Sequence, residues 1–237
     1  MAQFAGKRVL VIGGSRGIGA AIVRRLAADG GDVAFTYSGS KDAAADLASE
    51  TGARSIRSDA GDRDALVSVV RDEAPLDVLV VCAGTLALGD PLELDADAVD
   101  RMIDVNVRAP YHASVEAARK MKDGGRIVVI GSVNGDRMPF AGGAAYALTK
   151  SALQGMARGL ARDFGDRGIT VNVVQPGPTA TDMNPEDGPM KAVMHGFMAL
   201  KRHGRPEEIA GMVAYLAGPE AAFVTGALHT IDGGFGA

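Results

Sequence analysis

Short apolar runs rich in β-branched residues alternate along this chain with longer stretches in which apolar positions recur every three or four residues. The first pattern is typical of buried strands and the second of helices packed along one face. We expect strands near residues 7–12, 32–37, 54–58, 76–81, 125–131, 169–174 and 227–231. We expect helices near residues 17–29, 41–51, 62–73, 96–121, 145–165 and 206–217.

This alternation of strands and helices predicts an α/β fold, with a doubly wound parallel sheet and helices on both of its faces. The strand segments 9–12 and 78–81 are apolar throughout, as strands covered on both sides should be. No internal repeat or linker interrupts the pattern, so residues 1–237 are expected to form one domain.

One long stretch, 176–200, lacks this pattern and is rich in Pro, Gly and Met. Long ordered loops are usually functional, so we expect a substrate lid near 178–204. Met190, Met194 and Met198 follow one another at intervals of four, with Phe197 beside the last. Such a stripe either packs into the core or lines an apolar pocket, and the sequence leaves both alternatives open.

Composition and charge narrow the classes of partner. The net charge is −4, without a basic tail, which argues against nucleic acid and against a membrane surface as partners. No apolar run is long enough to span a bilayer, and residues 1–8 do not resemble a signal peptide, so a cytoplasmic location is expected. The four histidines have no metal-ligand spacing with one another or with Cys82, the single cysteine, so no metal is expected.

A glycine-rich turn follows the first expected strand and opens the first expected helix. The spacing Gly13-x3-Gly17-x-Gly19 provides a tight turn, close backbone approach to a pyrophosphate, and a helix N-terminus facing the phosphates. An ordinary turn is the alternative, but the position between strand and helix favours dinucleotide binding. The expected cofactor contacts here are Gly13, Ser15, Arg16, Gly17, Ile18 and Gly19.

The end of the second strand is where an NAD enzyme places a carboxylate on the ribose 2′-hydroxyl. This chain has Tyr37, Ser38 and Lys41 there, with Arg16 nearby and no acidic residue. Donors and positive charge suit a 2′-phosphate, so the predicted cofactor is NADP(H). Alternatively, Ser40 and Lys41 merely cap the second helix.

Two further turns complete the expected cofactor site. Asp59, after the third strand, is able to accept a hydrogen bond from the adenine amino group, and Ala83 and Gly84, after the fourth, let the backbone pass close to a ribose. Ordinary turn chemistry is the alternative for both.

Four polar residues after the expected fourth strand are candidates for catalysis. Tyr146 and Lys150 lie four apart at the start of a helix and so share one face. A free tyrosine hydroxyl ionises only near pH 10, and a cation one turn away stabilises the tyrosinate. Ser132 follows the fifth strand and is able to donate to a carbonyl oxygen, while Asn106 is a polar residue in an apolar helix.

Taken in order, these motifs resemble the short-chain dehydrogenase/reductase family along the whole chain. The resemblance implies that Tyr146 exchanges a proton with the substrate oxygen, Ser132 orients the carbonyl, Lys150 binds the nicotinamide ribose, and Asn106 holds a water of a proton relay. It also implies a Rossmann-type sheet of order 3-2-1-4-5-6-7 and a homotetramer built partly on the helix that carries the tyrosine. Residues Pro176, Gly177, Thr179 and Thr181 resemble the family stretch that contacts the nicotinamide carboxamide.

The chain departs from the family pattern at two points, neither of which touches the acid–base residues. Cys82 stands where the family usually has Asn, and the interval from Ser132 to Tyr146 is one residue longer than the commonest spacing.

The predicted function is therefore reversible, NADPH-dependent reduction of a ketone or aldehyde to an alcohol. A second hypothesis comes from segments 13–25, 35–37, 130–139 and 151–165, which resemble a bacterial member of the family that binds cyclic-di-GMP. Arg137 and the cluster Lys201, Arg202 and Arg205 are the candidate cations for such a ligand, although the cluster also suits a solvated helix entry or a subunit contact. A scaffold without turnover is a third alternative, against which the intact catalytic set argues.

Overall fold

The structure is a computed structural model that describes residues 2–237. Seven strands form one sheet, and every neighbouring pair is parallel. In spatial order they are β3 (Arg54–Arg57), β2 (Asp32–Tyr37), β1 (Arg8–Ile12), β4 (Val78–Val81), β5 (Arg126–Ile130), β6 (Thr170–Pro176) and β7 (Leu228–Ile231). The predicted doubly wound sheet and its strand order 3-2-1-4-5-6-7 are confirmed.

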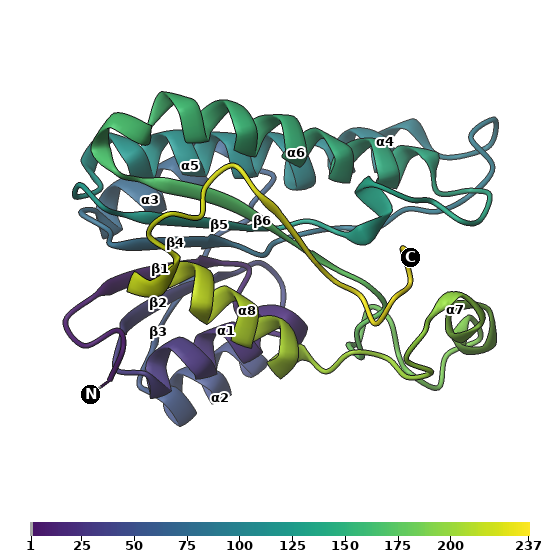
Figure 1. Ribbon diagram of the computed structural model, residues 1–237, viewed down its shortest axis with the longest axis horizontal. Helices are drawn as coiled ribbons and strands as arrows, with labels where there is room; N and C mark the ends of the chain where they lie inside the picture. The colour runs from purple at the N-terminus through teal and green to yellow at the C-terminus, as the bar shows by residue number, and fades with distance from the viewer. Residues whose placement is uncertain (1) are drawn as a thin grey trace.

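Two layers of helices cover the sheet (Figure 1). One layer contains α1 (Gly17–Ala28), α2 (Lys41–Thr51) and α8 (Pro206–Ala217). The other contains α3 (Arg63–Glu73), α4 (Ala96–Ile103), α5 (Ala109–Lys120) and α6 (Ala144–Asp163). Each layer buries its own apolar cluster against one face of the sheet, which explains why the segments 9–12 and 78–81 of the central strands are apolar throughout.

The expected helix at 96–121 is interrupted. A π-helical turn, η1 (Asp104–Arg108), joins α4 to α5, and it contains Asn106. The apolar periodicity continues through all three pieces, so the pattern predicts one helix and does not reveal the wider turn. Such π turns often occur at functional sites.

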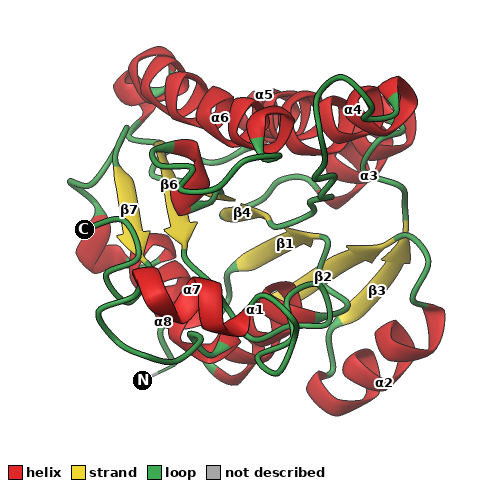
Figure 2. Cartoon of the chain, turned by 90° about the vertical axis from the view of Figure 1, so that its right-hand side faces the viewer, coloured by secondary structure: helices red, strands yellow, loops and turns green. Residues whose placement is uncertain are grey.

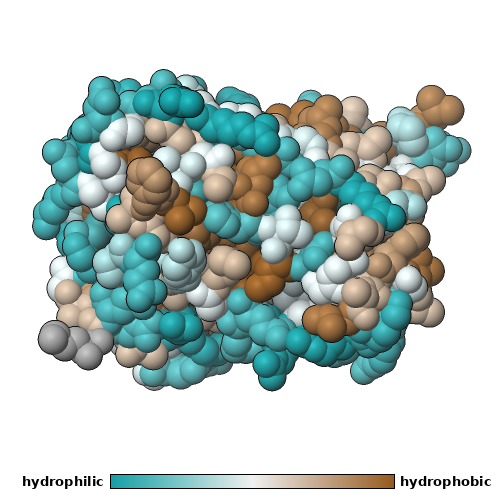
Figure 3. Space-filling model, viewed as in Figure 1, coloured by the Kyte–Doolittle hydropathy of each residue, from teal (hydrophilic) through white to brown (hydrophobic). Residues whose placement is uncertain are grey.

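The stretch expected to be irregular contains a short helix, α7 (Lys191–Phe197), held in front of the strand ends (Figure 2). Short 3-10 turns also occur at Val133–Gly135, Gly165–Arg167 and Pro219–Ala221. Apolar residues reach the surface near α7 and the loop ahead of α4, as brown patches toward the right in Figure 3. No helix in the described residues is long and apolar enough to cross a membrane.

Candidate active site

A cavity of about 600 Å³ opens at the carboxyl ends of the strands, where chains of this topology bind ligands. The glycine turn forms one end of its wall, and the starts of α6 and the lid form the other. Among the predicted site residues, the cavity is lined by Gly13, Ser15, Arg16, Gly17, Ile18, Gly19, Tyr37, Ser38, Asp59, Ala83, Gly84, Ser132, Tyr146, Lys150, Pro176, Gly177, Thr179 and Thr181. One continuous site thus contains the expected cofactor residues except Lys41 and the expected catalytic residues except Asn106.

The glycine turn requires glycine at two positions for steric reasons. Gly13 has a φ of 81°, and a Cβ there would lie 2.6 Å from the backbone of Ala83. A Cβ on Gly19 would lie 2.0 Å from the carbonyl oxygen of Gly13. The loop therefore packs against the end of β4 in a way that no side chain would allow.

The turn is held in place by the end of β2 and leaves the start of α1 open. Thr36 Oγ1 accepts a hydrogen bond from the Gly13 amide at 2.9 Å, and its carbonyl accepts one from Gly14 at 2.9 Å. Arg16 precedes α1, and no side chain caps the helix. Its first amides and its dipole are available to an anion, as a pyrophosphate requires.

The wall beside the end of β2 is formed by hydroxyl-bearing residues and contains no carboxylate from that strand. Arg16 lies across from it, 3.6 Å from Asp182 of the lid, with both side chains exposed. Lys41 is not among the residues that line the cavity, and its contact with the cofactor stays a prediction. Lys41 is the exposed first residue of α2, and residues 37–40 make the wall instead, because the chain turns into the helix just after them.

Asp59 lines the cavity but is already engaged. Its Oδ1 accepts from Arg101 at 2.5 Å and from the Gly61 amide at 2.9 Å. Burial opposes ionisation, yet these hydrogen bonds outweigh it and lower the pKa of Asp59. Asp59 is therefore an anionic acceptor at neutral pH, with Oδ2 left for a ligand. Arg101, from α4, was missed because nothing in the periodicity of a helix indicates which charged residue faces a distant turn.

Lys150 and Tyr146 extend from the same face of α6 toward the end of β5. The Lys150 ammonium donates to the Ile130 carbonyl at 3.2 Å and lies 5.8 Å from the centre of the Tyr146 ring. Lys150 is only 6% exposed, so its charge acts in a poorly solvated place, where it has a stronger electrostatic influence. Ser132 Oγ lies nearby on the cavity wall, where it accepts from the Asn134 amide at 3.1 Å and donates to Asn134 Oδ1 at 3.4 Å. The long second hydrogen bond is one that a substrate carbonyl oxygen would replace.

Asn106 is buried behind this group and does not line the cavity. Its amide exchanges two hydrogen bonds with the backbone of Thr85, both of 2.9 Å, and donates to Thr149 at 3.1 Å. It thereby ties the end of β4 to α6. Its expected role in holding a relay water stays a prediction.

The residues predicted to contact the nicotinamide carboxamide lie at the end of β6 and just after it, and their contact stays a prediction. Gly177 packs so closely that a Cβ would lie 2.6 Å from Asp232, and Thr179 is fixed by donating to the Gly177 carbonyl at 3.0 Å. Beyond it the lid supplies apolar contacts. Two methionines of the stripe have different surroundings. Met194 lines the cavity, while Met198 is buried in a small core with Val133 and Phe235.

Several apolar wall residues were missed by sequence reasoning. They lie on loops far apart in the chain, where no periodic pattern exists to mark them: Leu86, Leu88, Met138, Phe140 and Phe235.

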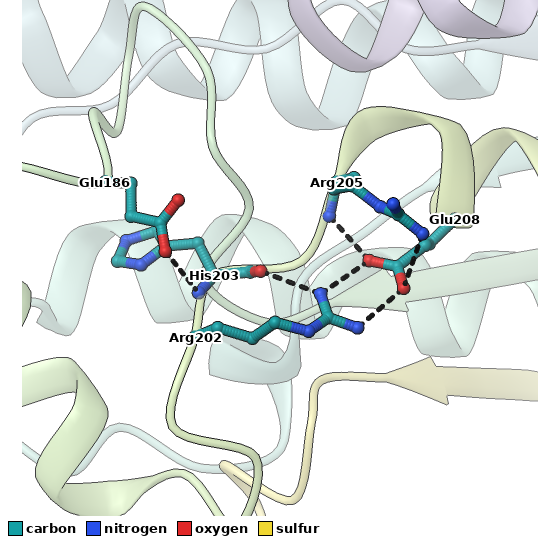
Figure 4. Close-up of polar contacts among 5 residues, drawn as sticks. All are labelled: Glu186, Arg202, His203, Arg205 and Glu208. Atoms are coloured by element: carbon teal, nitrogen blue, oxygen red, sulfur yellow. Dashed lines mark hydrogen bonds and ion pairs between the residues drawn. The ribbon is translucent and has the colours of Figure 1, made fainter.

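Two arginines of the basic cluster near the end of the lid, Arg202 and Arg205, share one carboxylate, that of Glu208 (Figure 4). Glu208 accepts two hydrogen bonds from Arg202, at 2.8 and 2.7 Å, and one from the Arg205 amide at 2.7 Å. These contacts lower the pKa of Glu208 to about 2. These contacts form part of the start of α8, in agreement with the alternative of a solvated helix entry.

Together these features define the class of protein. The doubly wound sheet carries a glycine turn, and one helix face carries a buried lysine and a tyrosine, as in a dinucleotide-dependent oxidoreductase. The chain belongs to the short-chain dehydrogenase/reductase family: a family model described as Enoyl-(Acyl carrier protein) reductase matches residues 12–236.

Individual relatives agree with this family. The chain is 68% identical, over the full length of both, to the cyclic-di-GMP-binding biofilm dispersal mediator protein of Escherichia coli K12. It is 37% identical to the 3-oxoacyl-(acyl-carrier-protein) reductase MabA of Mycobacterium bovis, covering 98% of this chain and 94% of the relative. A crystal structure of BdcA in complex with NADPH superposes with a TM-score of 0.98, at 68% identity, covering 99% of this chain and 96% of that one.

Proposed function

We propose that the protein uses NADPH to reduce a ketone or aldehyde to an alcohol, reversibly. The observation that carries this proposal is that Ser132, Tyr146 and Lys150 line the same cavity as the glycine turn. A carbonyl held beside a bound nicotinamide would therefore meet a hydrogen-bond donor and a proton donor at once.

In this mechanism each residue has a separate task. Ser132 donates a hydrogen bond to the carbonyl oxygen, and Tyr146 delivers the proton to that oxygen. Lys150, held by the Ile130 carbonyl, stabilises the tyrosinate that remains and binds the nicotinamide ribose. The nicotinamide, when bound, supplies the hydride that reaches the carbonyl carbon.

The choice of NADP(H) is supported by the wall at the end of β2. Tyr37, Ser38 and Ser40 offer hydroxyl groups, Arg16 offers charge, and no carboxylate of β2 is present to repel a 2′-phosphate. The relative crystallised with NADPH, at 68% identity, supports the same cofactor.

The apolar wall favours an apolar or cyclic ketone as the substrate class. The same cavity that Tyr146 lines is also lined by Leu86, Met138, Phe140, Met194 and Phe235. Burial of a substrate's hydrocarbon part there contributes about 25 cal/mol per Å².

The direct test is a panel of carbonyl compounds incubated with the protein and NADPH, followed at the absorbance of NADPH. We expect turnover to rise from acyclic polar ketones to cyclic apolar ketones. A panel on which no carbonyl compound accelerates NADPH oxidation above the rate without substrate would contradict the proposal.

Binding of cyclic-di-GMP is a second candidate function, favoured by the 68% identity to a relative named for it. Two phosphates need cationic partners. Arg137 is exposed, although its guanidinium donates to the Ala237 carbonyl at 2.8 Å. Lys201 donates to the His195 carbonyl, and Arg202 is paired with Glu208.

Calorimetry at physiological salt tests this candidate. If Arg137 binds a phosphate, Arg137→Ala weakens the binding of cyclic-di-GMP and leaves the binding of NADPH unchanged. Competition by NADPH would place the messenger in the cofactor cavity. No heat at high micromolar ligand, together with measurable ketone reduction, would remove this candidate.

A further inference from the structure

Three potential metal ligands meet outside the cavity. Glu186 precedes α7, His195 lies within it, and His203 follows it on the way to α8. Donor atoms of the three side chains lie within 4.8 Å of one another, and none of the three lines the cavity. The residue spacing does not indicate this cluster, because the histidines are eight residues apart and the intervening chain is not a continuous helix.

The two imidazoles face each other directly. His195 Nε2 lies 2.9 Å from His203 Nδ1, and the ring centres are 5.1 Å apart. His203 is only 2% exposed, and its other nitrogen, Nε2, is buried without a hydrogen-bond partner in the described residues. Nδ1 of His203, which faces His195, is therefore the nitrogen able to share an ion with it, while Nε2 keeps no partner.

The electrostatic surroundings suit a cation. Glu186 forms no ion pair among the described residues, and its Oε1 accepts from the His203 amide at 3.4 Å. Of the nearby cations, Arg202 is paired with Glu208 and Lys191 with Asp187, while Lys201 donates to the His195 carbonyl. The 2.9 Å contact between the two ring nitrogens requires at least one of the rings to be neutral, because one nitrogen must accept. A neutral imidazole is the form that binds a metal.

We propose that Glu186, His195 and His203 form a Zn²⁺ site in the lid. Two imidazole nitrogens and one carboxylate oxygen are ligands that zinc prefers, and Glu186 is not buried, so that water has access to a fourth position. Zinc bonds of about 2.0–2.1 Å at tetrahedral angles would hold the two nitrogens about 3.3 Å apart. The present 2.9 Å separation, with ring centres 5.1 Å apart, sets the two rings almost end to end, so zinc binding requires the rings to tilt as well as to separate by a few tenths of an ångström.

Such an ion would join three points of the lid. His195 is the neighbour of Met194, which lines the cavity, and His203 is the neighbour of Arg202, which is anchored to α8 through Glu208. Zinc would therefore fix α7 over the substrate end of the cavity. Because none of the three ligands reaches the cavity, the ion would order the lid and take no part in the reaction.

The test uses tag-free protein treated with a chelator, dialysed against ZnCl₂, and analysed for bound metal. We expect about one Zn²⁺ per chain, and a tetrahedral absorption spectrum when Co²⁺ is used instead. Glu186→Gln and His195→Ala should each weaken binding by more than roughly tenfold, because even loss of outer-shell partners costs that much. These two positions are chosen because His203 is buried and its variants risk misfolding.

His112→Ala serves as the matched control, since this histidine lies on α5, away from the lid. It should bind zinc like the wild type. Limited proteolysis gives a second readout: zinc should slow cleavage within 182–204 in the wild type and in His112→Ala, but not in His195→Ala. Less than about one tenth of an equivalent of zinc in the wild type, or equal binding by all variants, would overturn the proposal.

Discussion

Cys82 lies at the carboxyl end of β4, where the family usually has Asn, and it borders the cofactor cavity. Burial raises the pKa of its thiol to about 12, and the nearby charge of Lys150 only partly opposes this. Because the thiolate is the reactive form, we expect native protein to alkylate roughly a hundredfold or more slowly than unfolded protein at pH 8. Iodoacetamide labelling followed by mass spectrometry measures both rates, and equal rates would show that the thiol is not shielded.

Ser38 tests the basis of cofactor choice. A carboxylate at this position would repel the 2′-phosphate and accept from a 2′-hydroxyl, so Ser38→Asp should change the ratio of kcat/KM for NADPH to that for NADH. We expect a shift of at least tenfold toward NADH, which corresponds to about 1.4 kcal/mol. Ser38→Asn, of similar size but neutral, is the control. A wild type that uses both cofactors equally would contradict the assignment of Arg16 and Ser38.

At the level of residues, the sequence predicted best the groups whose chemistry depends on local spacing. Tyr146 and Lys150 share a helix face, and Gly13 and Gly19 occupy a strand-to-helix turn, so each pair could be placed from the chain alone. Arg101 and Phe235 could not, since they reach the cavity through the packing of segments distant in sequence. The same reason hid the contact between His195 and His203.

Among the elements, α8 depends on Glu208 for its first turn. Glu208 accepts from the Arg205 amide and pairs with Arg202, so its pKa falls from 4.5 to about 2 on folding. A carboxyl group whose pKa is lowered stabilises the fold above the unfolded value, and that contribution is lost as pH falls from 4.5 toward 2.

Glu208→Gln keeps the cap and removes the charge. We expect it to lower stability at pH 7 by less than about 1 kcal/mol, since both arginines are largely exposed. Urea unfolding at several pH values measures the difference, which should shrink below pH 4.5. A difference that stays constant down to pH 2.5 would rule out the ionised pair as its cause.

The boundaries of most elements could be predicted from hydrophobic periodicity, because each helix buries one face on a covered sheet. Two elements could not be predicted in this way. The π turn around Asn106 keeps the apolar pattern of its flanking helices, and α7 has no buried residue of its own to produce such a pattern. Both contribute to the site, where function sets local structure as much as packing does.

At the scale of the whole molecule, exposed apolar residues on α5 and α6 bear on the prediction that the chain assembles into a homotetramer. Leu148, two residues after Tyr146, is 59% exposed, and Tyr111 on α5 is 48% exposed. The predicted homotetramer would cover this face. We expect light scattering to give about four times the chain mass of 24.3 kDa, and Leu148→Asp to reduce it. A monomeric wild type would contradict the prediction.

The central claim is that Tyr146 donates the proton in an NADPH-dependent carbonyl reduction. Comparison of wild type and Tyr146→Phe on the best ketone of the panel, with NADPH affinity measured in parallel by fluorescence, tests it most directly. Removal of a positioned general acid should lower kcat by roughly 10²–10⁴-fold, while NADPH affinity changes little because the ring remains. Retention of near wild-type kcat by Tyr146→Phe, with NADPH still bound, would contradict the account.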